Sequence, residues 1–118
     1  MIYKTRKSKE RGDFLREVIA MPKVSIIIAT YNFGRYIAET IESVLHQTFT
    51  DYEIIVIDDG STDNTRDVLN KYGNKIRYSY QENVGVVKSR LRGLKESRGA
   101  YIATLDADDI WLPDKLKR

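Results

Sequence analysis

Two carboxylates one residue apart, Asp106 and Asp108, directly follow an apolar run in this sequence. Hard oxygen ligands in this pattern suit Mn²⁺ or Mg²⁺. Because few other protein ligands are at hand, the metal would share its shell with water and phosphate oxygens, and would neutralise charge on a departing diphosphate. The alternative is structural: Asp108 or Asp109 caps a helix that begins at Ile110.

A second carboxylate pair, Asp58 and Asp59, follows another apolar run. A carboxylate can accept hydrogen bonds from a nucleobase or a ribose, or it can close an Asx turn before a helix. We expect Asp58 to have the structural role and Asp59 to contact a ligand. Tyr31, after the first apolar run, can stack on a base or donate its hydroxyl, and otherwise it is a half-buried aromatic residue.

The basic candidates lie in one predicted helix. Arg90, Lys88 or Arg92 could meet a phosphate, but at this spacing only Lys88 and Arg92 share a helical face, and all three also fit a solvated surface. The single histidine, His46, is expected to have only a structural role near a helix end. Trp111 is expected to be a packing anchor.

The elements that position these residues are strands alternating with helices. Continuous β-branched runs predict strands buried on both faces, and the alternation in residues 75–80 predicts a strand at the sheet edge. The order β-α-β-α-β-α-β predicts an α/β fold with a parallel, Rossmann-like sheet and flanking helices. The strands are expected at 24–29, 53–58, 75–80 and 101–105, the helices at 36–47, from 61 towards Gly73, at 86–97 and from Trp111 onward.

Polar residues cluster where three of the four predicted strands end, after Ala29, Ile57 and Leu105. In open α/β sheets, ligands bind outside the carboxyl ends of the strands, where the strand order reverses. We therefore expect the acidic side chains of two turns to converge with Tyr31 on a single pocket that holds a metal-bound diphosphate.

Composition narrows the function classes. The 118 residues suit one domain, and with no cysteine the chain has no disulfide framework or thiolate metal site. The net charge of +3 belongs to residues 1–20, so residues 21–118 sum to zero, and a nucleic-acid partner is not expected. We interpret residues 1–20 as a basic N-terminal extension, either a short amphipathic helix or a flexible arm. It is either a solvated segment or a contact to anionic lipid or a partner.

Four ordered blocks of this sequence resemble family 2 glycosyltransferases, which have the GT-A fold. The similarity extends from about residue 21 to the end, so residues 21–118 look like the nucleotide-sugar-binding half of that domain. The blocks are PKVSIIIATYN (22–32), SVLHQTF (43–49), EIIVIDDGSTD (53–63) and GAYIATLDADD (99–109).

The resemblance implies roles for particular positions. Asn83-Val84-Gly85 fits a family loop, but Ser89 and Leu91 replace the alanine and asparagine that often flank the arginine matched by Arg90. The implied roles are Ala29 and Tyr31 lining a nucleobase pocket, Asp59 bonding the base, Arg90 near the nucleotide, Asp106 contacting the ribose or the metal, and Asp108 ligating Mn²⁺ or Mg²⁺.

The implied activity is inverting transfer from a nucleotide-sugar, with UDP as the expected carrier, to a glycan or lipid-linked acceptor in cell-surface polysaccharide synthesis. The implied location is the cytoplasm, at the inner face of the membrane. Transfer needs a general base to take the acceptor proton. That base and the acceptor site are expected beyond residue 118, so residues 1–118 are expected to bind donor and metal without catalysing transfer.

Three alternatives remain open from the residues. A non-catalytic module could bind a nucleotide or a partner through the basic extension. A sugar-phosphate nucleotidylyltransferase would want a glycine-rich loop after the first strand, where Thr30–Arg35 stands instead, and an aspartate-based phosphoryl-transfer fold would want a lysine or threonine at later strand ends. Self-association is also expected, through an apolar sheet edge near Tyr101–Leu105 and Trp111.

Overall fold

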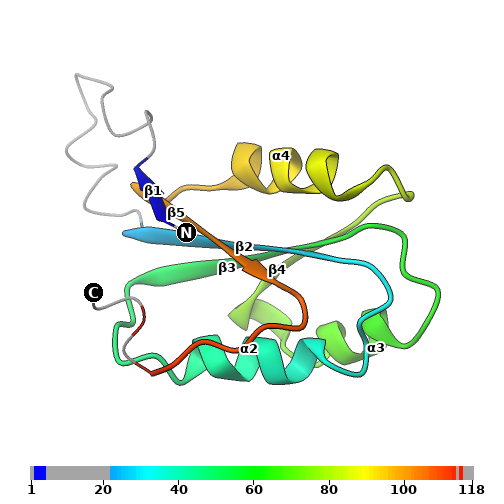
Figure 1. Ribbon diagram of the computed structural model, residues 1–118, viewed down its shortest axis with the longest axis horizontal. Helices are drawn as coiled ribbons and strands as arrows, with labels where there is room; N and C mark the ends of the chain where they lie inside the picture. Colours follow the sequence, from blue (N-terminus) through cyan, green and yellow to red (C-terminus); the bar gives the residue numbers. More distant parts are fainter. Residues whose placement is uncertain (1, 5–21, 114, 116–118) are drawn as a thin grey trace.

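The computed structural model describes residues 2–4, 22–113 and 115 (Figure 1). Most of the predicted basic extension therefore lies outside the described residues. The described elements are β1 (Ile2–Lys4), β2 (Val24–Thr30), α2 (Ile37–Leu45), β3 (Tyr52–Asp58), α3 (Thr65–Asn70), the 3-10 turn η2 (Gly73–Lys75), β4 (Arg77–Tyr80), α4 (Val86–Glu96) and β5 (Tyr101–Asp106).

The sheet has the order β1-β5-β2-β3-β4. Strands β5, β2, β3 and β4 are parallel, as predicted, and β1 is antiparallel to β5. From β2 the chain moves outward to β3 and β4 on one side and later returns to place β5 on the other. The strand order therefore reverses at β2, and its carboxyl end is where this fold binds ligands.

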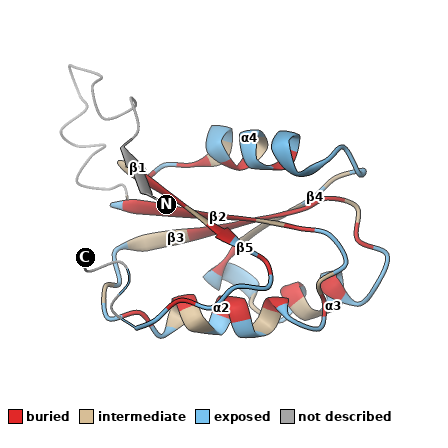
Figure 2. Cartoon of the chain, in the orientation of Figure 1, coloured by how far each residue is buried: buried red, intermediate tan, exposed pale blue. Residues whose placement is uncertain are grey.

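The helices form two layers on the sheet: α2 and α3 cover one face and α4 the other (Figure 1). The core between the sheet and α2 is aliphatic. Alternate residues of the central strands, such as Ile26, Ile28 and Ile54, pack there with Ile41 and Val44. Figure 2 shows this burial concentrated in β2, β3 and the inward sides of the helices.

Helix α4 packs on the opposite face through small residues. Ser89 and Gly93 are its buried positions. A Cβ atom on Gly93 would lie only 2.5 Å from Cγ2 of Ile27, so the absence of a side chain is what allows this close approach. The side chains of Val87, Leu91 and Leu94 in α4 consequently lie away from the sheet.

The third predicted strand begins later than expected. Residues 73–75 form a 3-10 turn, and the Lys75 N–H donates to the Tyr72 carbonyl at 3.0 Å, so pairing with β3 starts at Arg77. The prediction that this strand lies at a sheet edge is confirmed. Gly73 has a φ of +55°, which suits the chain reversal after α3.

Of the helix expected from Trp111 onward, the structure describes only residues 111–113 and 115. Trp111, Leu112 and Pro113 are not helical, whereas Lys115 lies in a 3-10 turn and its N–H donates to the Leu112 carbonyl at 3.1 Å. Two hydrogen bonds fix Trp111 and Leu112 against α2 and the loop after it: Trp111 N–H donates to Ser43 Oγ at 3.1 Å, and Gln47 Nε2 donates to the Leu112 carbonyl at 2.5 Å. Trp111 is a core residue with only 7% of its surface exposed, in agreement with its predicted packing role.

The open apolar edge expected near Tyr101–Leu105 and Trp111 is not observed. Strand β1 pairs with Tyr101, Ile102 and Ala103, and Trp111 is buried. Strand β1 therefore covers three residues of the edge from which self-association is predicted, and self-association itself stays a prediction. Within the part of the chain that the structure describes, every helix is too short or too polar to cross a membrane.

Candidate functional site

A pocket of about 310 Å³ lies at the carboxyl end of β2. Its walls come from the end of β2, the loop after it, the turn after β3, and the loop that leads into α4. Three residues predicted to bind a nucleotide line it: Ala29, Tyr31 and Asp59. The full set is Ala29, Thr30, Tyr31, Phe33, Asp59, Asn83, Gly85, Val86 and Ser89.

The parallel pairing of β2 and β3 brings Tyr31 and Asp59 together. Thr30 is in register with Asp58, and the Asp59 N–H continues the pairing by donating to the Thr30 carbonyl at 2.8 Å. Tyr31 is 45% exposed, so its ring is available to a ligand.

The Asp59 carboxylate is buried and already has several partners. It accepts hydrogen bonds from the backbone N–H groups of Val84 at 2.8 Å and Gly85 at 2.9 Å, and from Gln81 Nε2 at 3.1 Å. Burial acts to raise the pKa of Asp59, but the hydrogen bonds together outweigh it and hold the pKa below its ordinary value. Asp59 is therefore ionised at neutral pH and anchors the loop before α4.

A residue that the sequence analysis did not single out, Gln81, links Asp59 to α4. Its Nε2 also contacts Ser89 Oγ at 3.0 Å, and its Oε1 accepts from Arg92 at 3.0 Å. Gln81 directly follows β4. Its position at a strand end is the sequence signal that points to it, but Gln81 is an amide and the prediction rested on carboxylates.

Asn32 joins the two loops on the other side of the pocket. Its Oδ1 accepts from the N–H groups of Thr62 at 2.8 Å and Asp63 at 3.3 Å, while its own N–H donates to Ser61 Oγ at 2.9 Å. Its φ of +57° lies in the left-handed region, which asparagine tolerates better than most residues. This conformation follows Tyr31 directly and sets the path of the loop that carries it.

Asp58 has the structural role expected for it. The side chain is fully buried, accepts the Ser61 N–H at 2.9 Å and accepts the Tyr78 hydroxyl at 2.6 Å. Burial and the Asp58 carboxylate raise the pKa of Tyr78 well above its ordinary value. Tyr78 is therefore a neutral donor that keeps Asp58 in place under the turn.

Asp106 and Arg90 lie beside the pocket but do not line it. Asp106 is in register with Ala29, which does. Arg90 and Asp106 form an ion pair with a distance of 3.0 Å between Nη2 and Oδ1. Arg92, on a different side of α4, donates hydrogen bonds to Gln81 and Glu96 instead. Arg90 is thus the α4 arginine that faces the end of β5.

The predicted metal motif is a short turn with two exposed carboxylates. Asp106 and Asp108 are exposed, whereas Ala107 between them is buried and its carbonyl accepts from Thr40 Oγ1 at 2.8 Å. The described residues include no group of three or more His, Cys, Asp or Glu side chains that could hold a metal. The two carboxylates of Asp106 and Asp108 fit Mg²⁺ or Mn²⁺, because these ions accept water and substrate oxygens in the rest of their coordination shell.

The expected convergence is thus partial in this structure. Tyr31, Asp59 and Ala29 share one pocket, and Arg90 and Asp106 pair at its side. His46, predicted to have no role in the site, is the C-cap residue of α2.

Comparison with known proteins shows the family. The sequence model described as "Glycosyl transferase family 2" matches residues 25–118. An uncharacterised glycosyltransferase of Nostoc sp. (strain PCC 7120) is 45% identical over 100 residues, which cover 81% of this chain and 31% of the relative. The chondroitin synthase of Escherichia coli is 39% identical over 115 residues, 95% of this chain and 16% of that protein.

Among solved structures, S. aureus TarS in complex with UDP-GlcNAc has a TM-score of 0.72 and 35% identity, over 80% of this chain and 29% of that one. The chain spans less than a third of the length of each of these three proteins. The match of residues 25–118, the GT-A arrangement of the sheet and these relatives establish that the chain belongs to glycosyl transferase family 2.

Proposed function

We propose that this chain carries the donor-binding part of a nucleotide-sugar-dependent, inverting glycosyltransferase of polysaccharide synthesis, and that UDP is the nucleotide of the donor. The observation that carries the proposal is the pocket at the carboxyl end of β2, which is lined by Ala29, Tyr31 and Asp59 and flanked by Arg90 and Asp106. A similar protein, TarS, was solved with UDP-GlcNAc, and another relative is a chondroitin synthase.

Each of these side chains has a task that its environment suits. The half-exposed ring of Tyr31 offers a face on which a nucleobase can stack. Ala29 leaves room for the base at the pocket wall. The ionised Asp59 carboxylate can accept a base N–H, and the N–H groups of Val84 and Gly85 hold it in a fixed position.

Asp106 and Asp108 would hold Mn²⁺ or Mg²⁺, and Asp106 is also placed to contact the ribose. The bound cation would neutralise charge on the diphosphate as the sugar departs. Arg90, next to Asp106, adds a fixed positive charge for the phosphates.

The acceptor in this proposal is a glycan or a lipid-linked saccharide, and the reaction takes place in the cytoplasm at the inner face of the membrane. The general base that takes the proton of the acceptor hydroxyl is assigned to sequence beyond residue 118. The 118 residues alone are then expected to bind the donor without transferring its sugar.

Isothermal titration of the chain with UDP, with and without Mn²⁺, tests the proposal. The variant Asp108→Ala should lower the affinity for UDP in the presence of Mn²⁺ at least about tenfold, since a metal with two protein ligands loses one of them. The matched control is Asp67→Ala, which removes an exposed carboxylate from α3, a helix that does not line the pocket.

Folding of each protein is checked by circular dichroism. A folded parent chain that takes up no UDP, or an Asp108→Ala variant that binds UDP and Mn²⁺ as tightly as the parent, would overturn the proposed site. Competition by UMP, CDP and GDP tests the base preference separately.

A further inference from the structure

Helix α4 has its large apolar side chains on the outside. Its buried positions are Ser89 and Gly93, which meet the sheet. Val87, Leu91 and Leu94, at spacings i, i+4 and i+7, are 67%, 51% and 44% exposed. This spacing places them on one stripe along the helix. Figure 2 shows the outer turns of α4 exposed and only its underside buried.

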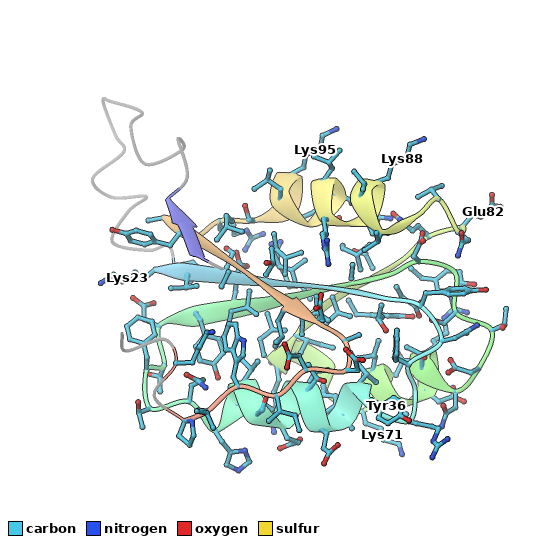
Figure 3. The ribbon with its side chains drawn as sticks, viewed as in Figure 1. Lys23, Tyr36, Lys71, Glu82, Lys88 and Lys95 are labelled. Carbon is cyan, nitrogen blue, oxygen red and sulfur yellow. The ribbon has the colours of Figure 1, made fainter. Side chains whose placement is uncertain are left out.

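Lysine side chains lie within the same outer face. Lys88 and Lys95 project from α4 away from the sheet (Figure 3). Between Asn83 and Lys95 the sequence has no Asp or Glu. We call the surface formed by Val87, Lys88, Leu91, Leu94 and Lys95 the outer α4 face.

We propose that the outer α4 face docks on an anionic lipid bilayer. Helices that lie in the membrane interface combine an aliphatic stripe, which enters the headgroup and acyl boundary, with lysines that reach the lipid phosphates. The outer α4 face has both features and no carboxylate to oppose them. The helices of the opposite layer are net negative, because α2 carries Glu39 and Glu42 and no basic residue, while the charges of Arg66 and Asp67 in α3 cancel. This asymmetry turns the α4 side toward a negative surface.

A second copy of the chain fits this face less well. Two copies that pair through the same face meet by a two-fold axis, so Lys88 and Lys95 of one copy would approach the lysines of the other. Like charges brought together in an interface oppose association. A bilayer rich in phosphate headgroups presents the complementary charge instead.

The outer α4 face also adjoins the candidate site. Val86 and Ser89 of α4 line the pocket, and Arg90 of the same helix pairs with Asp106. A bilayer on this face would therefore lie next to the pocket. The docking itself does not depend on the proposed function. Its use depends on that function, because docking would bring a lipid-linked acceptor to a bound donor.

Sedimentation with vesicles tests the docking. The chain should bind vesicles of phosphatidylcholine with one third phosphatidylglycerol more tightly than vesicles of phosphatidylcholine alone. The double variant Val87→Gln/Leu91→Gln should lower binding to the anionic vesicles about tenfold or more, because it removes two aliphatic side chains from the interface. Its matched control is Ile110→Gln/Leu112→Gln, which alters side chains that are 56% and 65% exposed but lie outside α4.

The lysines are tested in the same assay. Each of Lys88→Gln and Lys95→Gln should weaken binding to anionic vesicles about fivefold, and 0.5 M salt should reduce the difference. Lys71→Gln, an exposed lysine beside α3, is the matched control and should have little effect.

A spectroscopic readout separates this surface from the basic N-terminal residues. Leu91→Trp should shift its emission to shorter wavelength on anionic vesicles, and Leu112→Trp should not. Anionic vesicles that do not bind the parent, equal binding by Val87→Gln/Leu91→Gln, or an unshifted Leu91→Trp would each overturn the proposal. So would a stable dimer in the absence of lipid that this double variant converts to monomer. Titration of Val87→Gln/Leu91→Gln and Lys95→Gln with UDP and Mn²⁺ in the absence of vesicles should match the parent, so failure of docking is distinguishable from failure of the donor site.

Discussion

Arg90 Nη2 lies 3.0 Å from Asp106 Oδ1, so a helix on one face of the sheet is tied to the end of the strand that carries the metal motif. The side chains are 48% and 64% exposed, and an ion pair this open contributes little to stability. The ion pair matters for the site, because the Arg90 guanidinium contacts the Asp106 carboxylate, which is also proposed to bind a metal ion. A carboxylate has lone pairs on two oxygens, so Asp106 could hold the proposed cation while Arg90 stays beside it, next to the proposed position of the diphosphate.

Replacing Arg90 with Gln should therefore weaken the affinity for UDP in the presence of Mn²⁺. We expect a loss of about tenfold, or about 1.4 kcal/mol, because a charged partner of the diphosphate is removed. Calorimetric titration measures the effect, with Lys71→Gln as a control remote from the site. Unchanged or tighter UDP binding by Arg90→Gln would mean that Arg90 serves only to pair with Asp106.

Acid should destabilise the fold through Asp59 and Asp63. Burial acts to raise the pKa of each, but hydrogen bonds outweigh it: those to Asp59 come mainly from Val84, Gln81 and Gly85, those to Asp63 from Thr65 and Gly34. Both pKa values therefore lie below the ordinary value of 3.8. A lowered folded-state pKa gives stability that is present above the unfolded value and is lost as the pH falls through the folded one.

Urea unfolding at a series of pH values checks this. The free energy of unfolding should fall as the pH drops below 3.8, and the fall should be shallower in the double variant Asp59→Asn/Asp63→Asn. The same slope in parent and double variant would assign the acid sensitivity to other groups.

Loss of the Asn32 side chain should loosen the pocket. Asn32→Ala removes the acceptor for the Thr62 and Asp63 N–H groups and puts alanine at a φ of +57°. We expect a loss of about 1–3 kcal/mol in the free energy of unfolding. Asn32→Gly keeps the backbone freedom and lacks the acceptor, so it separates the two causes. Chemical denaturation measures all three proteins, and equal stability of Asn32→Ala and parent would contradict the argument.

Gly93→Ala should destabilise the chain even though alanine is the better helix former. The new methyl group would lie 2.5 Å from Cγ2 of Ile27, a core residue that is 2% exposed. We expect a net loss of about 1–3 kcal/mol, because overpacking outweighs a gain of about 1 kcal/mol in helix propensity.

A double-mutant cycle with Ile27→Ala identifies the cause of that loss. Ile27→Ala removes the obstructing methyl group, so Gly93→Ala should cost less in that background than in the parent. Independent, additive effects of the two substitutions would show that the helix does not press on Ile27.

The central strands were predictable because their signal is strong. Apolar runs such as Ile26–Ile28 and Ile54–Ile57 are buried on both faces, and no other element type accommodates so many consecutive β-branched residues as well. The same sheet logic placed Tyr31 and Asp59 at neighbouring strand ends, and they do share a pocket.

The hydrogen bonds that fix the loops of the site were harder to predict from the sequence. The links from Gln81 to Asp59 and from Asn32 to the next turn join residues 22 and 30 positions apart, and no local pattern encodes such pairs. The backbone contacts of Trp111 and Leu112 were unpredictable for the same reason, because their partners are Ser43 in α2 and Gln47 just after it. Strand β1 has only three described residues, too few for a periodic signal.

That short strand also determines what else can join the sheet. Each side of a β-strand has one set of N–H and C=O groups, and β1 already uses those of Tyr101–Ala103 on the side of β5 away from β2. Any further segment that is to pair with this side of β5 must displace β1, and otherwise it can only pair with the outer side of β1. Residues 2–4 and any such segment therefore compete for the same backbone hydrogen bonds of β5, and only one of them can form these bonds at a time.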